Sequence, residues 1–120
     1  MFVSMILDDT FILTGHTAPN MPRIKNRVSN LVRHCRYFYI GLTNRPWNRF
    51  MEHNRYDGIE WDKMVLLYKT SSLVKEGAFE QELIQYYRES QYSKKLKNSK
   101  GGGEGRYGKA PHYIYVLLKY

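Results

Sequence analysis

RYFYIGLTNRPWNRFMEH, residues 36–53, holds an aromatic segment, a turn and the start of a helix. Its first part, residues 36–42, is aromatic and β-branched with a glycine near its end, which predicts a central strand of a sheet. Residues 43–46 (TNRP) then read as a turn with capping residues, and Pro46 suits the first turn of the helix that follows. The stretch therefore predicts a strand, a turn and a helix in direct succession.

The segments on both sides of this unit predict further strands and helices. Strands are predicted at residues 9–14, 64–69 and 112–119, helices at 22–32 (with Asn20 as the cap) and 78–88, and a long loop rich in Lys, Gly and Ser at 93–109. Strands that alternate with helices in so short a chain predict an α/β (α+β) fold. We expect a small, mostly antiparallel sheet of three to four strands flanked by helices.

Length and composition favour one domain covering residues 1–120. The chain has 120 residues, of which 42% are hydrophobic and 15% aromatic, enough for a modest core. A single cysteine, Cys35, excludes an internal disulfide framework and a zinc site built from four cysteines. No segment approaches the roughly 18 apolar residues needed to cross a bilayer. We expect a soluble, intracellular protein of the cytoplasm or nucleus, without a membrane partner.

The net charge of +8 is unevenly distributed. Residues 23–55 hold eight Lys or Arg and one Glu, and residues 94–109 hold six and one, whereas residues 56–93 hold four bases and seven acids. Such blocks favour a polyanionic partner, because Lys and Arg that contact phosphates release condensed counterions. The alternative is a solvated basic surface that aids solubility.

Four residues of the opening stretch suggest a chemical site. Tyr39 lies near the end of the predicted strand, and Gly41 would let a ligand approach the backbone closely. Arg49 and His53 are four residues apart and share one face of the predicted helix. A phenol, a guanidinium and an imidazole around one volume suit phosphodiester chemistry, because Arg binds phosphate oxygens while Tyr or His transfers a proton. Each residue alone also has an ordinary structural explanation.

Residues 37–53 resemble the second half of the signature of the GIY-YIG nuclease family. The matching features are Tyr39-Ile40-Gly41, Thr43, the pair Arg49-x-x-x-His53, Trp61 with the strand MVLLYKTSS, the helical Glu80-Gln81-Glu82-Leu83-Ile84 and, as the nearest match to a later asparagine, Asn98. The resemblance covers about residues 36–118, and residues 1–35 would then hold a divergent strand and a basic helix. Gly41 and Thr43 would support the site.

The resemblance implies a metal-dependent DNA endonuclease that hydrolyses phosphodiester bonds with an activated water. Glu80 would hold one Mg²⁺ (or Mn²⁺) ion, and Glu82, two residues further on, would face another side of the helix. Arg49 would neutralise charge in the transition state. Tyr39 would act as general base or relay with the help of His53, while Asn98 would position Glu80 or the phosphate.

The expected partner is DNA, in double-stranded form. Arg45, Lys94, Lys95, Lys97 and Lys100 are the candidate contacts to its backbone, and the alternative for the lysines is a solvated loop. A homodimer or a partner protein would supply specificity, since so short a chain has little room for a recognition domain. Two other functions stay open: a non-catalytic nucleic-acid-binding module that retains the fold and needs no Glu80, and an interaction domain whose charge is incidental.

The first triplet of the family signature, Gly-Ile-Tyr, is missing upstream of Tyr39. Either that strand has diverged and lies near residues 11–13, or its tyrosine comes from elsewhere. The last predicted strand resembles the family's first strand in composition, and within it Tyr113 and Tyr115 share one face by the two-residue period of a strand. One of them supplies a second phenol beside Tyr39, or both pack on helices as in an ordinary strand. In that case another tyrosine serves, or the domain works without one.

Overall fold

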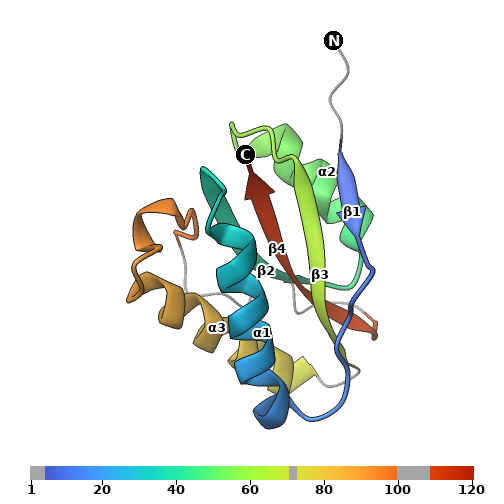
Figure 1. The fold of residues 1–120 in the computed structure, drawn as a ribbon. Helices are drawn as coiled ribbons and strands as arrows, with labels where there is room; N and C mark the ends of the chain where they lie inside the picture. The colour runs from blue at the N-terminus through green and yellow to red at the C-terminus, as the bar shows by residue number, and fades with distance from the viewer. Residues whose placement is uncertain (1–4, 71–72, 100–108) are drawn as a thin grey trace.

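The computed structural model describes residues 5–70, 73–99 and 109–120 of the chain. The elements in these residues are, in order, β1 (Ile6–Asp8), α1 (Thr17–Val32), β2 (Tyr37–Thr43), α2 (Pro46–Tyr56), β3 (Lys63–Thr70), α3 (Leu73–Arg88), the short 3₁₀ helix η1 (Ser93–Lys95) and β4 (His112–Lys119). Within this described part the four strands form one mixed sheet, with α1 and α3 on one face and α2 on the other (Figure 1). The predicted α/β fold, a small, mostly antiparallel sheet flanked by helices, is therefore confirmed.

The last strand, β4, lies in the middle of the sheet. The strand order is β1-β3-β4-β2, and β4 is antiparallel to both of its neighbours, while β1 pairs parallel with β3. Tyr115 of β4 is the register partner of Gly41 on β2 and of Leu66 on β3. The topology thus places the strand that carries Tyr39 directly beside the last strand, although the two are far apart in the sequence.

Strand β2 is an edge strand, so its prediction as a central strand was wrong. Its outer edge is partly covered by the segment after η1, where Lys97 donates its backbone N–H to the carbonyl of Phe38 at 2.8 Å. The last four residues of β2, Ile40 to Thr43, are all buried. A strand that is covered on both faces has the sequence pattern of a central strand whether or not it has two neighbouring strands. Sequence alone does not separate the two cases.

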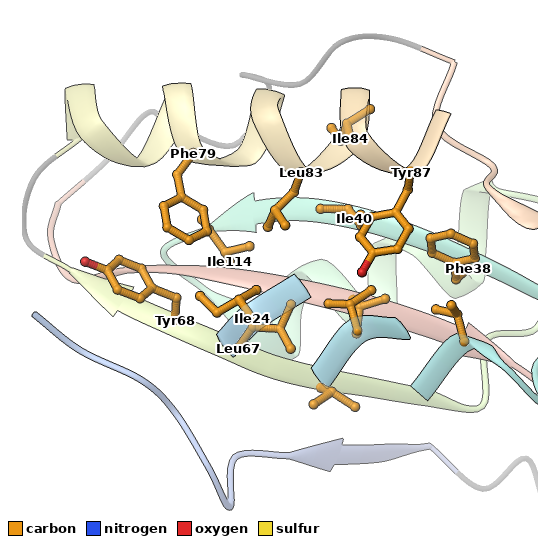
Figure 2. Close-up of a cluster of buried hydrophobic side chains, with 14 of the residues drawn as sticks. Ile24, Phe38, Ile40, Leu67, Tyr68, Phe79, Leu83, Ile84, Tyr87 and Ile114 are labelled. Carbon is orange, nitrogen blue, oxygen red and sulfur yellow. The ribbon is translucent and has the colours of Figure 1, made fainter. Parts of the chain in front are cut away.

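Two core clusters lie on opposite faces of the sheet. The first lies between the sheet and the helices α1 and α3 and includes Ile24, Ile40, Leu83 and Ile114 (Figure 2). Each fully buried apolar side chain contributes roughly 1.5–3 kcal/mol, so this cluster supplies much of the stability. The second cluster lies on the face of α2 and includes Tyr115 with Phe50 and Trp61, among others. Successive residues of β4 therefore point to opposite faces, as the strand period predicts.

The N-terminal boundaries differ from the predicted ones. The first strand is Ile6–Asp8 and not residues 9–14, where Leu13 makes an isolated bridge to Tyr68. Helix α1 begins at Thr17, ahead of both of its prolines. Pro19 lies in the first turn, where backbone N–H groups have no partner inside the helix, and Pro22 lies further inside the helix. Asn20 is therefore not the cap, since it lies inside the helix and donates its amide to the carbonyl of His16 at 2.8 Å.

The other boundaries agree more closely. β2 and β3 lie within about a residue of the prediction, and β4 covers the same residues, 112–119. Helix α2 begins at Pro46, which the sequence placed in its first turn. Helix α3 begins at Leu73, earlier than the predicted residue 78. Among the helices of the described residues, none has the length and apolar character that crossing a membrane requires.

Candidate active site

A pocket of about 330 Å³ lies between β2 and α2. Its walls come from β2, from α2 and the segment that follows it, and from the segment that follows η1: Tyr39, Arg49, His53, Asp57, Ile59, Trp61, Lys97 and Ser99. The rings of Tyr39 and His53 lie 4.6 Å apart, centroid to centroid. The structure thus brings the phenol, the guanidinium and the imidazole of the opening stretch around one volume.

Tyr115 places a second phenol beside Tyr39. It is buried, with 1% of its surface exposed, and its ring stacks on that of Tyr39 with centroids 6.4 Å apart. Its hydroxyl oxygen lies 2.8 Å from Nε2 of His53, and it interacts with the Arg49 guanidinium through charge and a hydrogen bond. The sequence left open whether a tyrosine of the last strand lies beside Tyr39, and in the structure Tyr115 does so.

Gly41 and Thr43 support this arrangement for identifiable reasons. A Cβ atom built on Gly41 would overlap both the hydroxyl and the ring of Tyr115, so the phenol can cross its neighbouring strand only where that strand has a glycine. The Thr43 hydroxyl accepts a hydrogen bond from the backbone N–H of Arg45 at 3.1 Å, in the turn that leads into α2. Strand and helix are therefore joined with a fixed geometry.

Both ring nitrogens of His53 have protein partners. Nδ1 lies 2.6 Å from Oδ2 of Asp57, and Nε2 faces Tyr115. Burial lowers the pKa of His53 and the Arg49 charge lowers it further, against a raising effect of Asp57, which favours the neutral imidazole. A water molecule or ligand could therefore bind a ring nitrogen of His53 only in place of one of these two contacts.

Asp57 and Trp61 belong to the site although sequence reasoning gave neither a place there. Asp57 follows the last residue of α2, and Trp61 is buried, with 1% of its surface exposed. The indole Nε1–H of Trp61 donates to Oδ2 of Asp57 at 2.9 Å, the same oxygen that contacts His53. The sequence feature that could have indicated the contact of Asp57 with His53 is their four-residue spacing, which places both residues on one face of a helix.

Arg49 keeps a permanent positive charge at the pocket. Its guanidinium is partly exposed and contacts the Glu52 carboxylate at 3.1 Å. Burial acts to lower its pKa, but the interactions with Tyr115, Glu52 and Tyr39 outweigh burial and raise the pKa above its ordinary value. Burial also holds the pKa of Tyr115 well above its usual range, and the charges of Tyr39 and Glu80 raise it while Arg49 lowers it. Tyr115 is therefore a neutral hydroxyl near neutral pH.

Glu80 is buried on α3, with 3% of its surface exposed, and its charge reaches the Tyr115 hydroxyl. Glu82 is exposed, as its different side of the helix predicts. Within residues 5–70, 73–99 and 109–120 no group of three or more His, Cys, Asp and Glu could hold a metal ion. A single carboxylate does fit Mg²⁺, which keeps several waters and binds one or two carboxylates together with substrate phosphates.

Asn98 lies at the outer edge of β2. Its side-chain oxygen accepts the backbone N–H of Ile40 at 2.9 Å, and its amide donates to the carbonyl of the same residue at 2.7 Å. A side-chain amide here mimics a neighbouring strand and satisfies both backbone groups. The structure therefore gives Asn98 a role in holding the strand that carries Tyr39.

The predicted DNA-contacting residues differ in their surroundings. The Lys95 ammonium donates to the carbonyl oxygens of Val32 and Arg33, at 3.0 and 3.1 Å, and so satisfies the C-terminal end of α1. The Lys97 ammonium lies 4.1 Å from the centroid of the Tyr37 ring, and Lys97 also lines the pocket. Arg45 and Lys94 are exposed, and Lys100 lies outside the described residues.

Comparisons of the whole chain with protein-family models, with curated proteins and with solved structures found no match. The chemistry of the site therefore carries the functional argument. The pocket and its surroundings hold two phenols, a permanently charged guanidinium and an imidazole held by a carboxylate. The buried carboxylate of Glu80, on α3, does not line the pocket and acts on this group through its charge on Tyr115.

Replacing Gly41 by alanine tests the contact with Tyr115. Gly41→Ala should lower the free energy of unfolding by about 1–3 kcal/mol, as overpacking of a core does. In a Tyr115→Val background, which removes the ring, the same alanine should be much less destabilising, so urea unfolding of the two single variants and the double variant should give a positive coupling energy. An equal destabilisation in both backgrounds would show that the glycine is not needed for the phenol.

Proposed function

We propose that this chain is a metal-dependent DNA endonuclease that hydrolyses phosphodiester bonds with an activated water. The observation that carries the proposal is the set of contacts around the pocket, where cationic Arg49 adjoins Tyr39, and Tyr115 and His53 are linked behind them. Binding phosphates needs only exposed cations. Buried titratable groups linked to one another beside a pocket are typical of acid–base chemistry, and the resemblance to GIY-YIG nucleases supports the same reaction.

Arg49 is the residue placed to bind the scissile phosphate. Its charge is permanent, its guanidinium is partly exposed at the pocket, and its partner Glu52 is more exposed than Arg49 itself. A phosphate that enters the pocket can replace Glu52, because guanidinium and phosphate oxygens form charge-assisted hydrogen bonds. The same group then stabilises the extra negative charge of the transition state.

Tyr39 is the phenol that would meet the attacking water. It is half-buried and lines the pocket together with buried His53, whereas Tyr115 is buried and is not one of the lining residues. A phenol can take a proton from water only if cations lower its pKa from about 10, and Arg49 and a bound metal would act in that direction. Tyr115 and His53 would hold Tyr39 and Arg49 in place.

Glu80 is the residue that would hold Mg²⁺ or Mn²⁺. When bound, the ion neutralises phosphate charge and lowers the pKa of a coordinated water. The burial of Glu80 and its interaction with the site through the Tyr115 hydroxyl support this assignment. Double-stranded DNA would extend from the pocket over Lys97, Lys94 and Arg45, and a homodimer or a partner protein would add specificity.

Plasmid nicking with and without Mg²⁺ tests the proposal. Wild-type protein should nick supercoiled plasmid only with Mg²⁺ or Mn²⁺, and Glu80→Gln should reduce the rate by about 10²-fold or more through loss of electrostatic stabilisation. Glu82→Gln, the same change at an exposed position two residues away, should leave the rate unchanged.

Metal-dependent nicking that persists undiminished in Glu80→Gln would refute the metal assignment. Binding of DNA without nicking in either metal would instead favour the non-catalytic binding module.

Arg49→Ala separates catalysis from binding. The rate of nicking should fall by about 10²-fold, while DNA affinity changes little, because this group lies where charge develops and is one phosphate contact among many. Arg55→Ala on the same helix, where the arginine is exposed and lies near the Tyr56 ring, is the matched control and should retain the rate. If an active wild type loses affinity but no rate on Arg49→Ala, the residue only binds phosphate.

A salt titration of DNA binding tests the basic surface. Arg45→Gln, Lys94→Gln and Lys97→Gln should each weaken binding, and each lost phosphate contact should reduce the slope of log affinity against log salt by roughly 0.9. Lys25→Gln removes the same charge from α1, on the other face of the sheet, and should leave the slope unchanged. Identical slopes for all variants would indicate a solvated surface.

A further inference from the structure

Oδ2 of Asp57 is held between two side chains of the α2 face. The buried indole of Trp61 donates its Nε1–H to this oxygen at 2.9 Å, and Nδ1 of His53 lies 2.6 Å from it. The position of Trp61 is itself fixed, because its backbone N–H donates to the side-chain oxygen of Asn54 on α2 at 2.5 Å. Trp61 therefore fixes the position of the Asp57 oxygen that contacts the imidazole of His53.

These contacts determine where the hydrogen of the imidazole lies. An indole N–H only donates and an ionised carboxylate only accepts, so Nδ1 of His53 has to carry the hydrogen that Asp57 accepts. In a neutral imidazole the other nitrogen, Nε2, is then an acceptor, and the Tyr115 hydroxyl 2.8 Å away donates to it. Because guanidinium groups only donate, the Tyr115 oxygen accepts from Arg49.

We infer that Asp57 is a positioning residue that, by fixing the hydrogen of His53 on Nδ1, sets the direction of the hydrogen bonds from the imidazole through Tyr115 to Arg49. As far as it concerns catalysis, this inference rests on the proposed function. The direction of the hydrogen bonds does not depend on that function.

The opposite tautomer would disrupt the site at two points. Without a hydrogen on Nδ1, two acceptors would face each other across 2.6 Å. With the hydrogen on Nε2, the imidazole and the guanidinium would both donate to the Tyr115 oxygen, and the phenolic hydrogen would have to leave the position between Tyr115 and His53. Burial and the Arg49 charge lower the pKa of His53 and so also disfavour the doubly protonated ring.

Nitrogen NMR of the imidazole measures the tautomer directly. In ¹⁵N-labelled wild-type protein at neutral pH, without DNA or metal, two-bond ¹H–¹⁵N spectra should show His53 protonated on Nδ1 and unprotonated on Nε2, with the signals assigned by their loss in His53→Gln. A His53 that is protonated on Nε2 alone, or on both nitrogens, overturns the inference. This result needs no variant of Asp57 and no enzymatic activity.

Asp57→Ala should release the tautomer. The same oxygen, Oδ2, faces both Trp61 and His53, so its removal leaves the Nδ1 hydrogen without its acceptor, and the form protonated on Nε2 should then appear in the spectra. Asp62→Ala is the matched control, because its carboxylate pairs with Lys119 at 3.6 Å and accepts the backbone N–H of Tyr120, and it should leave the His53 signals unchanged. An unchanged tautomer in folded Asp57→Ala would contradict the inference.

The catalytic part is read from plasmid nicking by the same two variants. Asp57→Ala should lower kcat by about 10²–10⁴-fold with KM nearly unchanged, as expected when the carboxylate that orients the imidazole is lost. Asp62→Ala should retain kcat. An active wild type whose Asp57→Ala variant changes tautomer but keeps its rate would overturn the catalytic part. A wild type that does not nick DNA refutes the proposed function, and the NMR result still decides the direction of the hydrogen bonds.

Discussion

The close packing of the Tyr115 ring over Gly41 is the contact on which the rest of the site depends. Tyr115 belongs to the middle strand of the sheet, and Gly41 is its register partner on the edge strand. Because that partner has no side chain, the phenol can lie across it and place its hydroxyl against His53. Arg49 lies one helical turn before His53, so the same contact also sets the guanidinium beside the phenols. A side chain at position 41 would overlap the Tyr115 ring and hydroxyl and so displace the phenol.

The two faces of the sheet have different compositions, and the pocket lies on the face that α2 covers. The face under α1 and α3 is packed with aliphatic and aromatic side chains. The face under α2 buries an imidazole and a phenol, together with the apolar part of its cluster. Buried polar groups are tolerable only when they bond to one another, and the chain of contacts from Trp61 to Tyr115 meets that requirement. The apolar face gives the stability that such a network needs.

The predictions that agree with the structure depend on neighbours in sequence. The strand, turn and helix at residues 37–56 and the approach of Tyr39 to Arg49 and His53 follow from strand and helix periodicities, which act over a few residues. Those periodicities do not predict that β2 is an edge strand, because the segment that covers its outer edge lies some 58 residues away in the sequence, where Asn98 binds Ile40. Sequence also left open whether Tyr115 or another tyrosine joins Tyr39, since strand order decides that. Asp57 was missed because an aspartate before a glycine is typical of a turn.

Strand β4 also determines at which point during synthesis the sheet can form. In the described sheet, β3 and β2 are joined through β4, whose residues come long after both in the chain. During synthesis the earlier strands and helices leave the ribosome without the strand that closes both core clusters, and non-local pairing of this kind forms slowly. Any nascent chain that lacks residues 112–119 has neither a complete core nor the Tyr115 phenol. The chemistry of the pocket is thereby withheld from partly synthesised chains, since the segment that finishes the fold is also the segment that finishes the site.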